Sequence, residues 1–151
     1  MKTMICLENI SYSQFNNEAI NQVNNYVESN NDELCIITLD QSYPFTSINT
    51  AIFAPSEMDS FNNGLILSST IKTTQMTLSC SNNSKKLLYL YDLDWMFYPV
   101  MYDDLYETLN NENLILVSRS NDHILPIKNL RGKGPDFVLE NFSLEEIWNL
   151  L

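Results

Sequence analysis

The chain has 151 residues, of which 44% are apolar and 18% charged, and this is enough to bury the core of one domain. Its net charge of −11 predicts a surface that repels phosphate backbones, so direct nucleic-acid binding is excluded from the expected functions. No stretch has the length and apolar content of a membrane span, and the start MKTMICLENI lacks the apolar centre of a signal peptide.

Short apolar runs alternate along the chain with stretches in which apolar residues recur at helical spacing. The runs are dense in Leu, Ile and Val and alternate little, which is typical of strands buried on both faces of a parallel sheet. The runs that predict strands cover residues 3–7, 33–39, 50–54, 64–68, 86–91, 113–117 and 136–139. Helices are predicted over residues 17–29, 70–80, 101–109 and 122–131, and from residue 143 onward.

Capping residues and prolines mark several of the predicted boundaries. Ser69 is expected to cap the helix that runs to Cys80, and Ser143 to cap the closing helix, with Glu146 at the capping-box position. Pro126 must lie in the first turn of its helix or kink it. Residues 40–64 form the least regular segment, for which an extra strand, a long loop and a short helix over residues 55–61 all stay open.

The order of these elements predicts the fold class. Strands that alternate with helices form βαβ units, whose right-handed crossovers build a parallel sheet. The prediction is therefore an α/β protein: a single three-layer Rossmann-like domain over residues 1–151, with a mostly parallel sheet of about five or six strands.

The three cysteines, Cys6, Cys35 and Cys80, are odd in number and show no CxxC spacing. We expect free thiols that pack as small apolar side chains, rather than disulfides or zinc ligands. Free thiols suit a reducing compartment, so the expected location is the cytoplasm.

The absence of several motifs reduces the number of reaction types that the chain could catalyse. With only three glycines and no GxGxxG or GxxxxGK[ST], the chain has no glycine-rich phosphate loop, which argues against dinucleotide redox chemistry and P-loop hydrolysis. There is also no GxSxG motif, and the single histidine rules out a site of several histidines around a metal.

Ligands of parallel sheets bind beyond the carboxyl ends of the strands, so residues at the strand ends are the candidates for a site. They are Glu8, Asn9, Asp40 and residues 68–70, 92–94, 118–120 and 140–141. Asp92 and Asp94, in YDLDW, could hold a divalent cation as DxD elements do; alternatively, Asp92 caps the next segment and Asp94 is solvated. The aromatic residues that follow could stack on a base or sugar, form a partner surface or pack under a loop; they are Trp95, Phe97, Tyr98 and Tyr102.

A second group of candidates follows the later strands. Arg119, with Ser120, ends a strand before a helix, where it could bind a diphosphate or instead form a surface ion pair. His123 could bond an anionic ligand, take part in proton transfer, or simply pack or cap. Glu140 ends the last predicted strand and completes the set of candidate ligand-binding residues.

Three segments, YLYDLDWMF, ILVSRSNDHILPIKNL and PDFVLENFSLEEIWNLL, resemble nucleotide-sugar glycosyltransferases, in particular the small glycosyltransferase-like proteins of tailed phages of the T4 group. In such proteins a strand ends in a WDLEW-like element, a later one in an RSEDH-like element, and the next in an ENF-like element. The matching positions are 91–95, 119–123 and 140–142, and the likeness extends over residues 50–151. The chain has room for only one of the two Rossmann-like halves of a complete enzyme of this type.

Two functions therefore stay open. The resemblance implies a phage domain in the host bacterial cytoplasm that binds a nucleotide sugar, with Asp92 and Asp94 near a divalent cation and Arg119 and His123 near the diphosphate. Transfer would need a partner or a homo-oligomer to complete the cleft. The alternative is a phage accessory protein that acts by contact with a host or phage protein, through the aromatic cluster or an acidic face that imitates DNA.

Overall fold

The computed structural model describes residues 2–29, 33–40, 42–97 and 102–151, without the side chains of Ser29, Trp95 and Phe97. Its strands are β1 (Thr3–Leu7), β2 (Leu34–Thr38), β3 (Ala51–Phe53), β4 (Leu65–Ser68), β5 (Lys85–Leu90), β6 (Leu114–Ser118) and β7 (Phe137–Val138). Its α-helices are α1 (Gln14–Ser29), α2 (Ile71–Ser79), α3 (Tyr102–Leu109), α4 (Ile124–Arg131) and α5 (Leu144–Asn149). Three 3₁₀ helices are η1 (Pro55–Ser60), η2 (Asp94–Phe97) and η4 (Asn121–His123).

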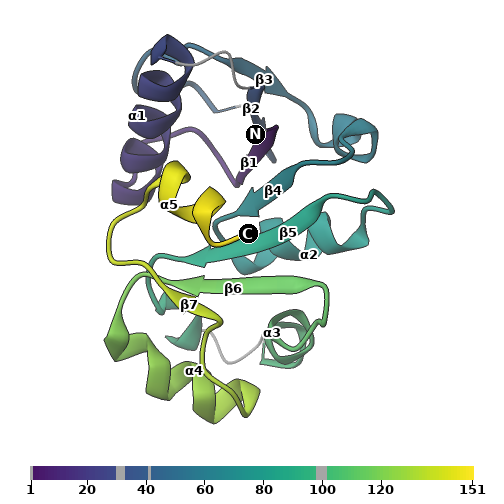
Figure 1. Ribbon diagram of the computed structural model, residues 1–151, viewed down its shortest axis with the longest axis vertical. Coiled ribbons are helices and arrows are strands. Elements are labelled where there is room, and N and C mark those ends of the chain that lie inside the picture. Colours follow the sequence, from purple (N-terminus) through teal and green to yellow (C-terminus); the bar gives the residue numbers. More distant parts are fainter. Residues whose placement is uncertain (1, 30–32, 41, 98–101) are drawn as a thin grey trace.

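All seven strands form one parallel sheet in the order β3-β2-β1-β4-β5-β6-β7 (Figure 1). This confirms the predicted α/β, Rossmann-like architecture. The predicted count of five or six strands is wrong, because the edge strands β3 and β7 pair with the sheet although they have only three and two residues. No helix among the described residues is long and apolar enough to cross a membrane.

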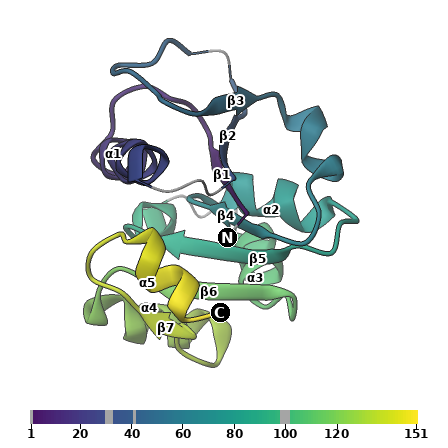
Figure 2. The same ribbon diagram turned by 45° about the horizontal axis from the view of Figure 1, so that its top comes forward.

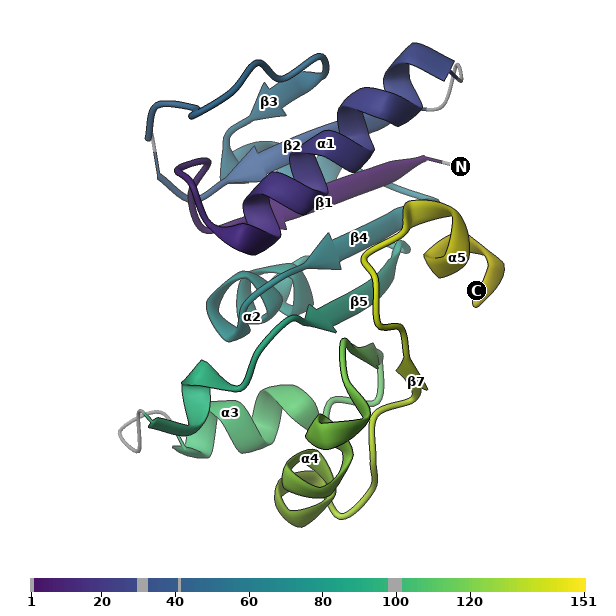
Figure 3. The same cartoon turned by 90° about the vertical axis from the view of Figure 1, so that its left-hand side faces the viewer.

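The helices form a layer on each face of the sheet (Figure 3). On one face α1 and α5 bury a core with the inward residues of the central strands, among them Leu67 and Tyr89. On the other face α2, α3 and α4 pack over β5 and β6, while η1 covers β1 through Met58 and the adjacent Phe61. The connection after β1 thus runs on one face and the connection after β4 on the other.

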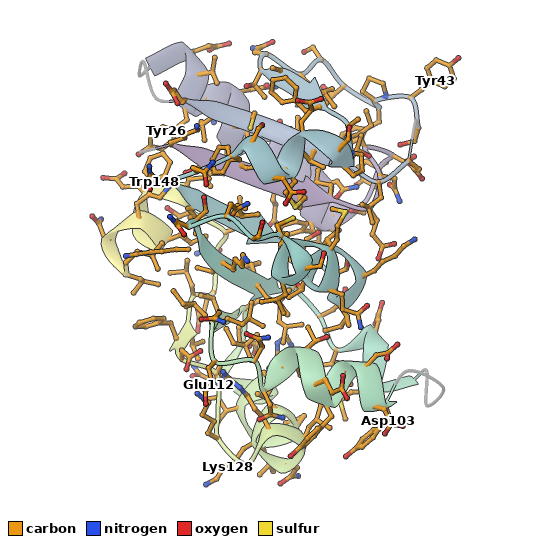
Figure 4. The ribbon with its side chains drawn as sticks, turned by 90° about the vertical axis from the view of Figure 1, so that its right-hand side faces the viewer. Tyr26, Tyr43, Asp103, Glu112, Lys128 and Trp148 are labelled. Carbon is orange, nitrogen blue, oxygen red and sulfur yellow. The ribbon has the colours of Figure 1, made fainter. Side chains whose placement is uncertain are left out.

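The two ends of the chain meet on the face that α1 covers. The indole Nε1 of Trp148, in α5, donates a hydrogen bond to Thr3 Oγ1 of β1 at 2.9 Å. The ring of Trp148 also meets Tyr26 of α1 edge-on, with centroids 4.6 Å apart (Figure 4). Helix α5 therefore covers the core near the amino end of β1.

Several boundaries differ from the sequence prediction for local reasons. Thr70, not Ser69, caps α2. Its hydroxyl accepts a hydrogen bond from the backbone N–H of Thr73, and the Thr73 hydroxyl accepts one from the backbone N–H of Thr70, which completes a capping box. The predicted helix over residues 122–131 is split into η4 and α4, and Pro126 lies in the first turn of α4, where a missing N–H costs nothing. The irregular segment 40–64 contains both a short strand, β3, and a short helix, η1.

The cysteines are free thiols, as predicted. Burial raises the pKa of the Cys6 thiol, and burial is also the main cause that raises the pKa of Cys35 to about 11. Both thiols are therefore protonated at neutral pH and behave as small packing groups.

Tyr89 is the largest fully buried side chain among the described residues, and its hydroxyl donates a hydrogen bond to the carbonyl oxygen of Leu139 at 2.8 Å. Tyr89→Phe leaves this carbonyl without its donor, and we expect the free energy of unfolding to fall by about 1 kcal/mol. Urea unfolding followed by circular dichroism measures the change. The matched control is Tyr43→Phe, whose ring is 92% exposed and whose stability should not change; an equal loss in both variants would contradict the assignment.

Candidate functional site

A cavity of about 700 Å³ lies beyond the carboxyl ends of β1, β4 and β5. Strands β1 and β4 are neighbours in the sheet, but the chain leaves them toward opposite faces, so their ends diverge. This is the topological switch point, where parallel α/β sheets bind their ligands. The residues that line it from the three strand ends include Glu8, Tyr12, Ser69, Thr70, Tyr91, Asp92 and Asp94.

The loop between β1 and α1 contains no glycine and is held by side-chain hydrogen bonds. The buried side-chain amide of Asn16 donates hydrogen bonds to the carbonyl oxygens of Asn9 and Ser11, at 3.0 and 2.8 Å. Ser13 caps α1 by accepting a hydrogen bond from the backbone N–H of Asn16 at 3.0 Å. Tyr12, at the tip, is 73% exposed and meets Phe45 edge-on. A side-chain amide thus holds a loop that presents an aromatic ring to the cavity.

Glu8 links the two strands that diverge at the switch point. The hydroxyl of Thr70, which caps α2, donates a hydrogen bond to Glu8 Oε1 at 2.8 Å. The hydroxyl of Ser69 contacts the carbonyl oxygen of Cys6 at 3.3 Å and adds a second link between β1 and β4. One carboxylate oxygen of Glu8 is therefore occupied, and no described residue bonds to the other.

The Asp92–Asp94 pair lies at the cavity, as expected for the end of β5. Asp92 Oδ1 accepts a hydrogen bond from the backbone N–H of Asp94 at 3.1 Å and so starts η2, and both side chains are exposed. This contact fits the interpretation of Asp92 as a cap and Asp94 as a solvated residue, and the cation-binding interpretation stays a prediction. Among the described residues, no three His, Cys, Asp or Glu side chains come together in a way that could hold a metal ion.

Arg119 lies beside the cavity, stacked on one of its walls. Its guanidinium carbon is 4.0 Å from the centre of the Tyr91 ring, and the Tyr91 hydroxyl donates a hydrogen bond to Glu18 Oε1 at 2.8 Å. Burial and this hydrogen bond raise the pKa of Tyr91 to about 12, so it stays protonated at neutral pH. Within the described part of the chain, no carboxylate forms an ion pair with Arg119, and its positive charge is available to a ligand.

Ser120 and His123 form the turn between β6 and α4. Ser120 caps η4 through the N–H of Asp122 at 3.1 Å, and Nδ1 of His123 lies 2.9 Å from the hydroxyl of the buried Ser118. Burial lowers the pKa of His123, although the carboxylates of Asp92 and Asp122 oppose this, so the ring is neutral at neutral pH. His123 therefore lies in the turn after β6, at the carboxyl edge of the sheet, but does not line the cavity.

The remaining predicted residues lie elsewhere. Glu140 is exposed after the edge strand β7, away from the cavity walls. Of the aromatic cluster, Tyr102 is 56% exposed on α3, so it does not pack under a loop. The side chains of Trp95 and Phe97, and all of Tyr98, lie outside the described residues.

The strand-end rule selects Glu8 and Thr70 as candidates, because Glu8 follows the first apolar run and Thr70 the fourth, and both line the cavity. Tyr12 and Tyr91 also line the cavity, but sequence reasoning did not select them. The adjacency of β1 and β4, which makes their ends a site, depends on the strand order.

Comparisons of the chain with protein-family models, with curated proteins and with solved structures found no match. The resemblance to phage glycosyltransferase-like proteins therefore stays a prediction.

Proposed function

We propose that this domain binds a nucleotide sugar in the switch-point cavity, as a single glycosyltransferase-like half. The observation that carries the proposal is the combination of carboxylates that line the switch-point cavity with the guanidinium of Arg119 beside it, which forms no ion pair with a described residue. Its volume of about 700 Å³ lies within the range of small-molecule sites, which is roughly 300–1,000 Å³.

The chemistry of the walls fits a ligand that has both hydroxyl and phosphate groups. The carboxylates of Glu8, Asp92 and Asp94 can accept hydrogen bonds from sugar or ribose hydroxyls. The ring of Tyr12 is exposed enough to stack on a base or sugar face. Arg119, at the edge of the cavity, can bind a diphosphate. It would take the place of a glycine-rich phosphate loop, which the sequence lacks.

We propose binding of the nucleotide sugar and not its transfer, because glycosyl transfer also needs a second half that binds the acceptor. The described domain supplies one sheet, and its cavity opens beyond that sheet. An acceptor-binding half would come from a partner or from a second copy of the chain.

Isothermal titration calorimetry with UDP-glucose, UDP and glucose, with and without Mn²⁺, tests the proposal. We expect UDP-glucose to bind, and Glu8→Gln to weaken binding about tenfold, because an amide cannot replace a charged acceptor of hydroxyl hydrogen bonds. The control Glu107→Gln changes an exposed carboxylate on α3 that does not line the cavity, and should bind like the parent chain. If none of the three compounds produces heat, the proposal is wrong.

A further inference from the structure

The edge strand β3 has no described strand on its outer side. It is the last strand in the sheet order, and among the described residues it pairs only with β2, through the register Cys35↔Ala51, Ile36↔Ile52 and Ile37↔Phe53. Its three residues are all exposed, with Ile52 and Phe53 each at 41%. Proteins usually block such an edge with a lysine, a proline or a bulge, and β3 contains none of these. Its free backbone groups can therefore pair with another extended chain.

An apolar groove of about 390 Å³ adjoins this edge on the face opposite α1. Its floor contains Met4, Cys35, Ala51, Phe53 and Phe61. The 3₁₀ helix η1 packs against β1 and β2 on this face and forms one wall of the groove through Glu57 and Ser60 (Figure 2). The groove and the open edge are continuous, since Ala51 and Phe53 belong to both.

The charges at the rim of the groove indicate what kind of chain fits. Lys2 is engaged within the domain: its Nζ lies 4.0 Å from Glu33 Oε2 and 4.6 Å from the centre of the Phe61 ring. Glu57 adds a second carboxylate to the rim, so the groove is negative overall, as is the chain with its net charge of −11. A second copy of the chain would bring the same carboxylates against these, whereas a basic segment would neutralise them.

We infer that β3 and its groove bind an extended, basic segment of a partner protein by strand addition. The segment's backbone extends the sheet beyond β3, one apolar side chain enters the groove, and Lys or Arg side chains lie beside Glu33 and Glu57. This site is separate from the switch-point cavity and does not depend on nucleotide-sugar binding, because the two share no residues.

The probe is a soluble peptide that alternates Arg and Val, titrated into ¹⁵N-labelled protein, with a Glu–Val peptide of equal length for comparison. We expect amide shifts at Ala51–Phe53 and Cys35 with the basic peptide only. Glu57→Lys should weaken binding about fivefold by reversing one rim charge. Ile52→Pro, which removes an N–H from the edge strand, is a second variant. Glu107→Lys reverses an exposed charge on α3 outside both cavities; it is the matched control and should bind the peptide like the parent chain.

Three outcomes would overturn the inference. Equal shifts with the acidic peptide would remove the charge argument. Shifts confined to the switch-point residues, or none at all, would exclude the strand-addition site. Analytical ultracentrifugation could also show a dimer that Glu57→Lys or Ile52→Pro dissociates. That result would mean that β3 pairs with a second copy of this chain instead.

Discussion

Asp136→Ala is expected to lower the free energy of unfolding by about 3 kcal/mol, because it removes the only charge partner of a buried guanidinium within the described residues. The side chain of Arg131 is 1% exposed, and its Nη2 lies 3.4 Å from Asp136 Oδ2. The same carboxylate oxygen accepts a hydrogen bond from the backbone N–H of Leu116 at 2.8 Å. The substitution therefore also frees a backbone donor at the junction of β6 with the edge strand β7. Urea unfolding measures the effect.

Two variants define the origin of that loss. Glu112→Ala removes an exposed carboxylate that precedes β6, and it should change stability by less than about 0.5 kcal/mol (Figure 4). Arg131→Met combined with Asp136→Ala replaces the buried charge by an apolar side chain of similar length, and it should be more stable than Asp136→Ala alone. If the double variant is as unstable as the single one, the Leu116 bond and not the buried charge is the cause.

Gly64→Ala is expected to cost about 2 kcal/mol of stability, within the range for overpacked sites. A Cβ atom at Gly64 would lie 2.6 Å from the carbonyl oxygen of Lys2 and 2.8 Å from the Phe61 ring. That carbonyl accepts the hydrogen bond of Leu65 N–H, which fixes β4 against β1, so it cannot move freely. The added methyl group therefore either displaces β1 or separates β1 from β4 at the amino ends of the two strands.

The matched control for this substitution is Gly134→Ala. There the nearest atom to an added Cβ is 3.6 Å away, an ordinary contact, and no positive φ is involved. We expect its midpoint in urea to equal that of the parent chain. Equal midpoints for the Gly64 and Gly134 variants would mean that β1 and β4 tolerate the added methyl group.

The fold follows from the sequence where a strand is buried on both faces. The apolar runs at β1, β2, β4, β5 and β6 have little polar alternation, which is typical of parallel strands covered on both faces. The apolar runs over residues 50–54 and 136–139 locate the edge strands, but not their membership of the sheet, because β3 is exposed along its whole length and owes its pairing to β2 rather than to its own burial. The position of the α2 cap depends on the reciprocal bond from Thr73, which a search for a single Ser or Thr does not detect.

The site follows from the sequence only in part. The rule that strand ends carry ligands predicts the position of Asp92 and Asp94 at the cavity, but not the capping hydrogen bond from the backbone N–H of Asp94 to Asp92. Glu8 and Thr70 are 62 positions apart, and their hydrogen bond exists only because β1 and β4 are neighbours. The stacking of Arg119 on Tyr91 likewise depends on the pairing of β5 with β6.

The hydrogen bond between Trp148 and Thr3 has a consequence for how the domain reaches its native state. The two residues are 145 positions apart, and β1 lies between β2 and β4 in the middle of the sheet. A domain that emerges from the ribosome in chain order can form the β1–α1–β2 unit early, but the apolar surface of that unit stays open until β4 and then α5 arrive. Contacts of such long sequence separation slow folding and prolong the exposure of aggregation-prone strands. Chaperone binding to nascent chains should therefore end only after α5 has left the exit tunnel.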